Sequence, residues 1–360
     1  MTKILNILKN AFLPILFVSI AFVACEGPEG PAGATGATGA KGDKGDTGLS
    51  GAEQCGVCHN NGVVLFEKAA QWEQSLHGEG EIYLYGNRAG SGCPECHTHQ
   101  GFLEYVETGA VNGPYNDPAT INCRTCHKIH VKYDETDWAL TKTNDVTFYE
   151  TAGPKATADL GAGNLCGQCH QARGTTPVID FGAASYNITS SRFGGHHSPA
   201  ANVFANNIAW VPTGSKTPSS SNVHSAVADA CVTCHMTQGP AVHGEGVGGH
   251  TFKTSSMEGE IQNPLACTPC HEEVKTFNDK EGFYDEFKTD MAAVDAKMQE
   301  LAWRTATGWK ATSSAPLVLT PNQAAAAYAY QVLLEDKSNG IHNPKYARAI
   351  LDNIMEVLGL

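Results

Sequence analysis

The sequence predicts a mostly α-helical protein with much irregular structure and a C-terminal helical hairpin. Within residues 272–360, apolar side chains recur at spacings of three and four, which is the repeat of one helix face; they are Phe283, Phe287, Met291, Val294, Met298 and Leu301. Residues 54–271, in contrast, are rich in Gly, Asn, Thr and Pro and contain few periodic segments. Such a stretch makes a poor conventional hydrophobic core.

Two more helices are expected in residues 272–360. One runs through Ala324 to about Lys337 and stops near Gly340, because glycine commonly ends a helix. The other starts at Asn343 and Pro344, an N-cap followed by proline at the first helical position. Residues 272–360 are therefore predicted to form a helical domain for packing or oligomerisation.

Residues 1–24 have the features of a lipoprotein signal peptide. Lys3 and Lys9 accompany an apolar run, residues 11–24, that is too short to span a bilayer. The run ends in Phe22-Val23-Ala24-Cys25, which resembles the lipobox of bacterial lipoproteins. Lipidation of Cys25 anchors a mature chain to a membrane. The alternative is an ordinary cleavage site followed by an unrelated cysteine.

Residues 25–53 are expected to form a collagen-like stalk behind the lipidated cysteine. Glycine occupies every third position from Gly27 to Gly51, as the crowded axis of a collagen triple helix requires. A stalk of this kind makes the protein a homotrimer. A flexible single-chain spacer is the alternative, because the repeat is short and poor in proline.

Twelve of the 13 cysteines lie in six copies of Cys-x-x-Cys-His within residues 54–271. This is the attachment motif of haem c, in which two thiols bind one porphyrin and the histidine binds its iron. The cysteines are Cys55, Cys58, Cys93, Cys96, Cys123, Cys126, Cys166, Cys169, Cys231, Cys234, Cys267 and Cys270, and the histidines are His59, His97, His127, His170, His235 and His271. Zinc sites and thioredoxin-like dithiols also use Cys-x-x-Cys, but neither requires a histidine after every second cysteine. Six covalent haems are predicted, and they would supply the core that residues 54–271 lack.

Nine histidines lie outside these motifs, and six suffice to give every haem a second histidine ligand. The candidates for this distal set are His77, His130, His224, His250, His342 and one of His196 and His197. His99 and His243 are expected at the surface, and Met236 and Met257 are the alternative axial ligands. Iron with two histidine ligands exchanges electrons and has no open position for a substrate.

Several segments resemble the multihaem superfamily of hydroxylamine oxidoreductase, cytochrome c nitrite reductase and their small electron-carrying relatives. They are Trp72-x-x-Ser75-x-His77, His196-His197-Ser198-Pro199, Cys231-Val-Thr-Cys234-His235-Met236, Gly248-Gly249-His250-Thr251-Phe252 and Gly340-Ile-His342-Asn-Pro344-x-Tyr346. The resemblance covers roughly residues 54–360 and implies a mostly α, haem-packed fold. It also implies proximal ligands at the six motif histidines and distal ligands at His77, His224, His250, His342 and, more loosely, His196 or His197.

The resemblance implies no catalytic activity. Nitrite reductases of that superfamily use a Cys-x-x-Cys-Lys haem, which this sequence lacks. Hydroxylamine oxidoreductases carry eight haems and a crosslinked tyrosine, whereas this chain has six motifs. Members of the hydroxylamine oxidoreductase group form trimers, which agrees with a trimeric stalk.

The sequence thus predicts a membrane-anchored hexahaem c-type cytochrome that transfers electrons between redox protein partners in respiration. The alternative is an oxidoreductase that acts on a small nitrogen or sulfur oxyanion at one five-coordinate haem. Haem c is attached after export, so the protein is expected outside the cytoplasm as an outer-membrane lipoprotein, on the periplasmic face or the cell surface. The formal net charge of −13 argues against nucleic acid as a partner.

Overall fold

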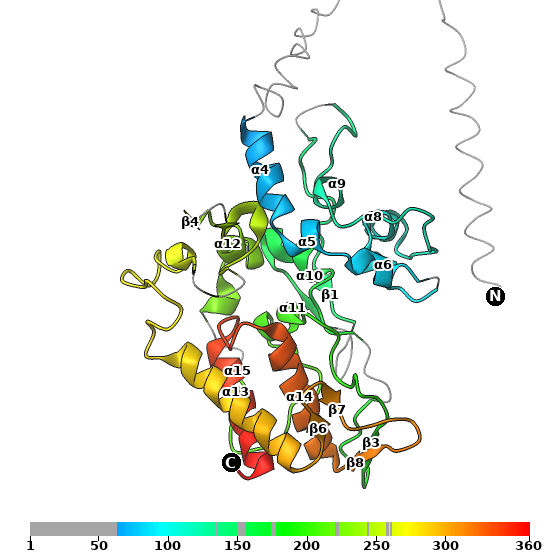
Figure 1. The fold of residues 1–360 in the computed structure, drawn as a ribbon, viewed down its shortest axis with the longest axis vertical. Coiled ribbons are helices and arrows are strands. Elements are labelled where there is room, and N and C mark those ends of the chain that lie inside the picture. Colours follow the sequence, from blue (N-terminus) through cyan, green and yellow to red (C-terminus); the bar gives the residue numbers. More distant parts are fainter. Residues whose placement is uncertain are drawn as a thin grey trace, which may run out of the picture. The chain divides into compact units, whose positions relative to one another are not determined.

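The computed structural model describes residues 63–88, 90–133, 136–149, 156–173, 178–219, 223–242, 245–256, 259 and 261–360 (Figure 1). These residues belong to one compact unit of the chain, Leu49–Leu360. The predicted signal peptide, lipidated Cys25, stalk and first Cys-x-x-Cys-His motif lie outside the described residues, as do His243 and Met257. The boundary predicted between residues 271 and 272 stays a prediction.

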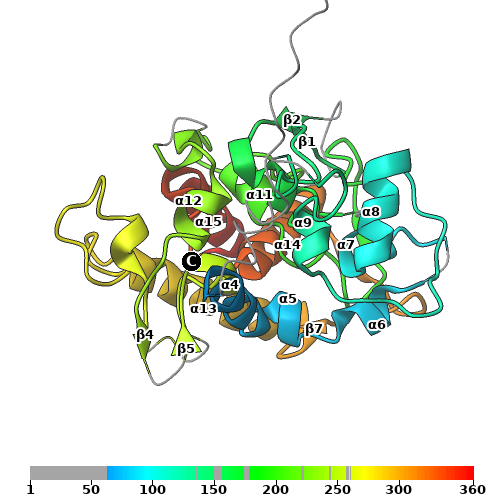
Figure 2. The ribbon, with the colours of Figure 1, turned by 90° about the horizontal axis from the view of Figure 1, so that it is seen from above.

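Short helices and turns make up most of the described chain before residue 272, in agreement with the predicted fold class. The α-helices there are α4 (Val63–Glu73), α5 (Leu76–Glu79), α6 (Ile82–Gly86), α7 (Pro94–His97), α8 (His99–Thr108), α9 (Cys123–Cys126), α10 (Asn164–Gly167), α11 (Ala200–Phe204) and α12 (Cys231–His235). The 3-10 helices are η1 (Gly161–Gly163), η2 (His224–Ala226), η3 (Gly249–Thr251) and η4 (Pro264–Ala266). Helix α7 packs against both α6 and α8, and the three helices form one group (Figure 2).

The strands are short and form antiparallel pairs. The pairs are β1 (Val146–Thr147) with β2 (Thr157–Ala158), β3 (Tyr186–Ile188) with β8 (Leu317–Leu319), β4 (Ala241–Val242) with β5 (Glu245–Gly246), and β6 (Arg304–Thr305) with β7 (Gly308–Trp309). In the β3–β8 pair, Tyr186 is opposite Leu319 and Ile188 is opposite Leu317. This pair ties the middle of the chain to its C-terminal helices.

The three predicted C-terminal helices are present as α13 (Phe283–Glu300), α14 (Pro321–Asp336) and α15 (Pro344–Leu358). The side chain of Thr320 caps α14 in a capping box with Gln323, which starts the helix before the predicted Ala324. Helices α14 and α15 form the predicted hairpin, and α13 adds a third helix because it also packs against α15. The C-terminal part is therefore a three-helix unit.

The main hydrophobic core lies around α14. It contains the four consecutive alanines Ala324–Ala327, Tyr328 and Tyr330, together with apolar faces of α13 and α15. A second, smaller cluster is formed around Phe148 and Leu160. Among the described residues before Val146, Phe102 alone is a buried hydrophobic side chain. The described chain before Val146 therefore has no conventional protein core, as its composition predicts. The same expectation is wrong for residues 179–210, which contribute buried apolar side chains to the main core.

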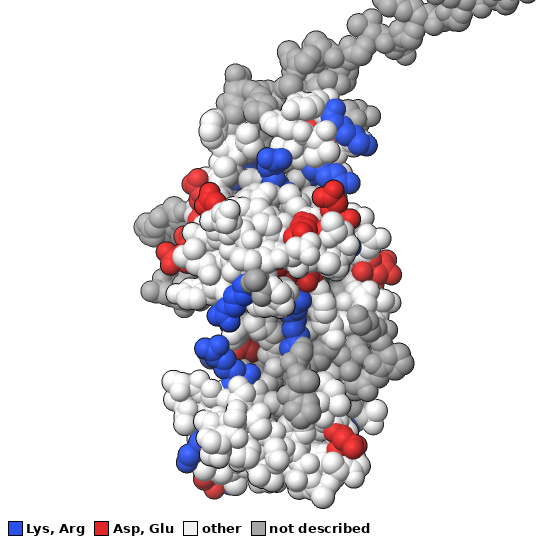
Figure 3. Space-filling model, turned by 90° about the vertical axis from the view of Figure 1, so that its right-hand side faces the viewer, with Lys and Arg blue, Asp and Glu red and all other residues white. Residues whose placement is uncertain are grey.

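Charged side chains are sparse on the face of the protein drawn in Figure 3. Figure 3 shows one face on which Lys, Arg, Asp and Glu side chains are scattered among uncharged ones, without an extended patch of either sign. Among the described residues, no helix has the length and apolar character needed to cross a bilayer.

Candidate haem-binding centre

Each described Cys-x-x-Cys-His motif folds as one helical turn. The backbone N–H of the motif histidine donates to the carbonyl of the first cysteine, at 3.1 Å for His97, 2.8 Å for His127, 3.0 Å for His170 and 2.8 Å for His271. Residues three apart are neighbours on a helical turn, so the two thiols of a motif lie on one side of it. In α9 the turn is fixed by a capping box between Asn122 and Thr125.

Every described motif histidine lies beside one histidine from outside the motifs. The ring centres are 5.9 Å apart for His97 and His196, 6.3 Å for His127 and His250, 6.0 Å for His170 and His77, 6.1 Å for His235 and His342, and 6.2 Å for His271 and His224. We call these the five histidine pairs. Their members come from separate parts of the chain, so the pairs form only when the chain folds.

The separation within the pairs fits two imidazoles on opposite sides of one metal ion. With metal–nitrogen bonds of about 2 Å, the two ring centres lie roughly 6 Å apart. Aromatic rings in ordinary contact span a wider range of about 4.5–7 Å. Ordinary contact does not explain why all five described motif histidines have one such partner each, with separations between 5.9 and 6.3 Å.

Four histidines of the pairs are held through Nδ1, which leaves Nε2 for a metal. The acceptors are the carbonyl of Trp138 for His127 at 2.8 Å, the carbonyl of Ile341 for His224 at 2.7 Å, the carbonyl of Phe252 for His235 at 2.8 Å, and the carboxylate of Asp336 for His342 at 2.6 Å. Histidine ligands of metals usually have such a partner on the second nitrogen. The ring orientation is therefore set by the protein before any metal binds.

Burial keeps both histidines of the His170–His77 pair neutral. Burial, together with the nearby rings of His77, His235 and His342, lowers the pKa of His170 to about 3. Burial also lowers the pKa of His77. A histidine must be neutral to bind a metal, so both rings are ready to act as ligands at physiological pH.

The fourth motif, on and after α10, lies between other motifs. The thiol of Cys96 in the second motif hydrogen-bonds Cys169 and, with burial, raises its pKa. The thiol of Cys231 in the fifth motif hydrogen-bonds Cys166. Cys126 of the third motif lies near both thiols and acts to raise the pKa of each. The fourth motif is thus a junction that touches the second and fifth motifs and lies near the third.

Phe252 links three of the five histidine pairs. Its ring centre is 5.3 Å from that of His77 and 5.8 Å from that of His250, and its carbonyl accepts from His235. Phe252 itself has a positive φ of 56°, as do Gly248 and Gly249 before it, at 78° and 56°. A Cβ on Gly248 would meet the carbonyl oxygen of Thr237 at 1.9 Å, so this tight backbone approach requires glycine.

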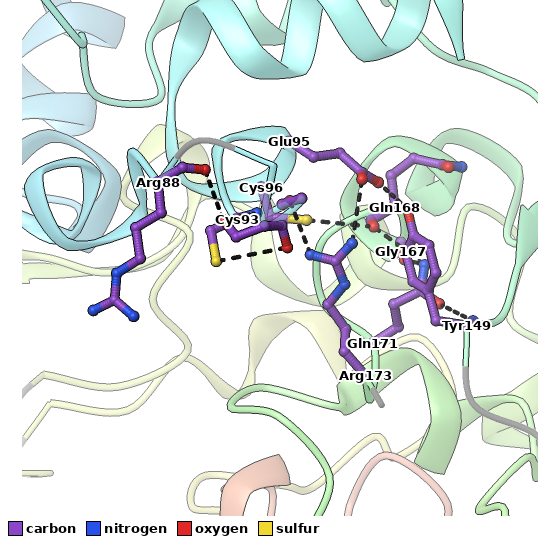
Figure 4. Close-up of polar contacts among 11 residues, drawn as sticks. Arg88, Cys93, Glu95, Cys96, Tyr149, Gly167, Gln168, Gln171 and Arg173 are labelled. Carbon is purple, nitrogen blue, oxygen red and sulfur yellow. Dashed lines mark hydrogen bonds and ion pairs between the residues drawn. The ribbon is translucent and has the colours of Figure 1, made fainter. Parts of the chain in front are cut away.

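A buried ion pair joins the second and fourth motifs (Figure 4). Arg173, three residues after His170, donates to a carboxylate oxygen of Glu95 at 3.2 Å and to the Gly92 carbonyl at 3.1 Å. The hydroxyl of Tyr149 donates to the other oxygen of Glu95, and the guanidinium lies 4.4 Å from the centre of the Tyr149 ring. Burial raises the pKa of Glu95, although Arg173 and Lys142 act to lower it. The sequence motifs did not point to this cluster.

Two candidate ligands, His197 and His130, lie outside the five histidine pairs, as does His99. His196 is the paired member of the His196–His197 sequence, whereas His197 has a 78% exposed side chain and an ion pair with Glu335 at 2.9 Å. His99, expected at the surface, is instead half-buried, with its Nδ1 2.9 Å from the Thr125 hydroxyl. His130 is exposed and stacks on Tyr133, with ring centres 5.6 Å apart.

Comparisons with known proteins give two structural similarities. The structure titled "Crystal Structure of Outer Cell Wall Cytochrome OcwA" matches with a TM-score of 0.49 and 19% identity, covering 81% of this chain and 50% of that one. The structure titled "Undecaheme cytochrome from S-layer of Carboxydothermus ferrireducens" matches with a TM-score of 0.43 and 20% identity, covering 78% of this chain and 40% of that one. The present chain thus spans half or less of each of these proteins. No protein-family model matches the sequence, and no curated protein matches it significantly.

Proposed function

We propose that the protein is an exported hexahaem c-type cytochrome that passes electrons between redox protein partners in respiration. The observation that carries this proposal is the set of five histidine pairs. Each pair joins the histidine of one Cys-x-x-Cys-His motif to one outer histidine, that is, a histidine outside the motifs. Bound haem c supplies a one-electron iron centre, and two histidine ligands leave it no open position. This arrangement suits electron exchange and does not suit substrate binding.

The described residues fit haem c better than zinc. All ten described motif cysteines are free thiols, which stand in for the thioether sulfurs of the attached form. Among the described residues, no three His, Cys, Asp or Glu side chains are grouped as the ligands of one metal ion, whereas a structural zinc site needs four. Large apolar side chains before residue 90, such as Phe66, Leu76 and Tyr85, are 66–71% exposed. Porphyrin faces would give these side chains the apolar contacts that the protein does not supply.

Within this proposal the chain holds and spaces the cofactors. The cysteines of each motif would hold one haem covalently, and the two histidines of each pair would bind its iron. The junction formed by the fourth motif brings three other motifs close to one cofactor. Electron exchange falls steeply with distance, so this junction would make one connected path.

The first test is low-temperature electron paramagnetic resonance of the oxidised protein, with haem counted per chain. We expect six haems and low-spin ferric iron only, because the five pairs supply two histidines to each described motif. An open position could then exist only at the first motif, which lies outside the described residues. A high-spin signal of about one-sixth of the iron would favour the alternative, an oxidoreductase acting on a small nitrogen or sulfur oxyanion.

For the first motif we propose His59 and His130 as the two ligands. The loop that carries His130 is held in place by the Asp137 carboxylate, which accepts from the backbone N–H of Val131, Lys132 and Tyr133 at 3.0–3.2 Å, and this support favours the proposal. We expect His130→Ala to convert about one-sixth of the iron to high spin, whereas His197→Ala, the matched control, leaves the signal unchanged. An all low-spin spectrum for His130→Ala would exclude His130.

We also propose that Cys25 is lipidated and that residues 26–53 form a trimeric stalk on an outer-membrane lipoprotein. The lipobox-like sequence and the glycine triplets support this proposal. We expect Cys25→Ser to move the protein from the membrane fraction to the soluble fraction. Deletion of residues 26–53 should convert the protein in solution from a trimer to a monomer. If the oligomeric state does not change, residues 26–53 are a spacer and do not form a triple helix. We propose that the chain shares the fold and the haem ligands of the hydroxylamine oxidoreductase and nitrite reductase superfamily but not the activities of those enzymes.

A further inference from the structure

Of the four paired histidines held through Nδ1, one is held by a carboxylate and the other three by backbone carbonyls. Nδ1 of His342 lies 2.6 Å from Oδ1 of Asp336, the last residue of α14. The Asp336 side chain is 1% exposed, and that of His342 is 22% exposed. Among the contacts between described residues, this is the one of the five histidine pairs in which a ring nitrogen contacts a carboxylate.

The turn between α14 and α15 is built to bring these two residues together. Lys337, Asn339 and Gly340 have positive φ angles of 58°, 47° and 83°, which fold the chain back on the end of α14. The Ser338 hydroxyl donates to the second oxygen of Asp336, so both carboxylate oxygens have donors. A Cβ on Gly340 would meet the rings of Phe283 and Phe287 at 2.9–3.0 Å, so the turn is fixed against the core.

The same turn also serves a second histidine pair. The carbonyl of Ile341 accepts from Nδ1 of His224 at 2.7 Å. One turn therefore orients His342, the partner of the fifth motif, with an anionic acceptor, and His224, the partner of the sixth motif, with a neutral one. The fifth and sixth motifs are neighbours, because α12, which is the fifth motif, contacts η4, which ends directly before the sixth.

We propose that Asp336 is a positioning residue that lowers the reduction potential of the fifth-motif haem below that of the sixth. A buried carboxylate that accepts from Nδ1 makes the imidazole a more basic ligand, and a more basic ligand favours ferric iron. The negative charge of Asp336, close to the iron, acts in the same direction. Electrons would therefore move downhill from the fifth motif to the sixth. This inference rests on the proposed haem-binding function.

The test is potentiometry of the full-length haem-loaded protein, followed by visible absorption and paramagnetic resonance. We expect Asp336→Asn, which keeps an acceptor but removes the charge, to shift the oxidised-to-reduced ratio of one haem about tenfold toward the reduced form at fixed potential. This shift corresponds to about 59 mV for a one-electron couple. His342→Met identifies which redox transition belongs to the fifth-motif haem, because this variant must alter the same transition as Asp336→Asn. Asp352→Asn, which removes a carboxylate paired with Arg348 on α15, is the matched control and should leave this step in place.

Each outcome is decisive. If Asp336→Asn loads six haems and no step moves, Asp336 does not set a potential and the inference is wrong. If Asp336→Asn fails to load haem, Ser338→Ala replaces it; removal of the hydroxyl donor leaves more negative charge on Asp336, so the same step must move toward the oxidised form, and an unmoved step overturns the inference. If the native chain itself carries no haem c, the proposed function fails, which is a separate result.

Discussion

A chain in which Cys166 and Cys169 are both replaced with alanine is expected to lose one-sixth of its haem and most of the electron exchange among the haems that remain. The fourth motif is the junction of the described motifs, since its cysteines contact Cys96 and Cys231 and lie near Cys126. Without its cofactor the second and third motifs lose their neighbour toward the fifth. Haem content is measured from the pyridine haemochrome spectrum, and electron exchange by stopped-flow reduction.

The matched control for this variant is the replacement of Cys267 and Cys270 with alanine. These cysteines belong to the sixth motif, and Cys270 is exposed. The control also removes one-sixth of the haem, but it removes a cofactor with one neighbouring motif, the fifth, among those described. Exchange among the other haems should therefore persist. Equal loss of exchange in both variants would mean that the fourth motif is not a junction.

The C-terminal helices could be predicted because their signals are local. The spacing of Phe287, Met291, Val294 and Met298 describes the buried face of α13, and Pro344 marks the first residue of α15. The helix predicted to run through Ala324 begins three residues earlier, at Pro321. Thr320 and Gln323 form a capping box that could have located it, because this signal also lies within four residues.

The candidate site also has parts with local sequence signals and parts that depend on the tertiary structure. The Cys-x-x-Cys-His motifs are contiguous, so sequence alone identifies them, and five outer histidines chosen from the sequence are the ones found in the five pairs. Their pairing depends on tertiary structure: His77 lies beside His170, and His196 rather than His197 lies beside His97. The acceptors of Nδ1 and the Glu95–Arg173 ion pair were not predicted, because these contacts join residues distant in sequence or side chains of no distinctive pattern.

Replacement of Arg173 with methionine is expected to lower the free energy of unfolding by about 3–5 kcal/mol at neutral pH, because it leaves the Glu95 carboxylate buried without its cation. The side chain of Glu95 is 9% exposed and that of Arg173 is 23% exposed. Arg173 also donates to the Gly92 carbonyl next to the second motif, so the variant loosens the connection between the second and fourth motifs. Urea unfolding followed by circular dichroism measures the loss, and six haems per chain show that assembly is intact.

The loss of stability in the Arg173→Met variant should depend on pH with a defined sign. Burial raises the pKa of Glu95 in the folded protein above its ordinary value of 4.5, and Arg173 opposes this rise. Without Arg173 the pKa rises further, so the folded state binds more protons than the unfolded state and stability falls as pH increases above about 4.5. The variant should therefore approach native stability near pH 4, and its stability deficit should grow as the pH rises above that value.

A second substitution separates the charge from the rest of the side chain. Glu95→Gln places at this position the residue that the fourth motif has at its own second intervening position, Gln168, so the motif tolerates it. In the double variant Arg173→Met, Glu95→Gln no charge remains buried, and most of the stability lost in Arg173→Met should return. The contrary result is a double variant that is as unstable as Arg173→Met, with neither stability depending on pH. The charge interaction between Glu95 and Arg173 would then contribute nothing to stability, and the packing of Arg173 on Tyr149 would hold the two motifs together.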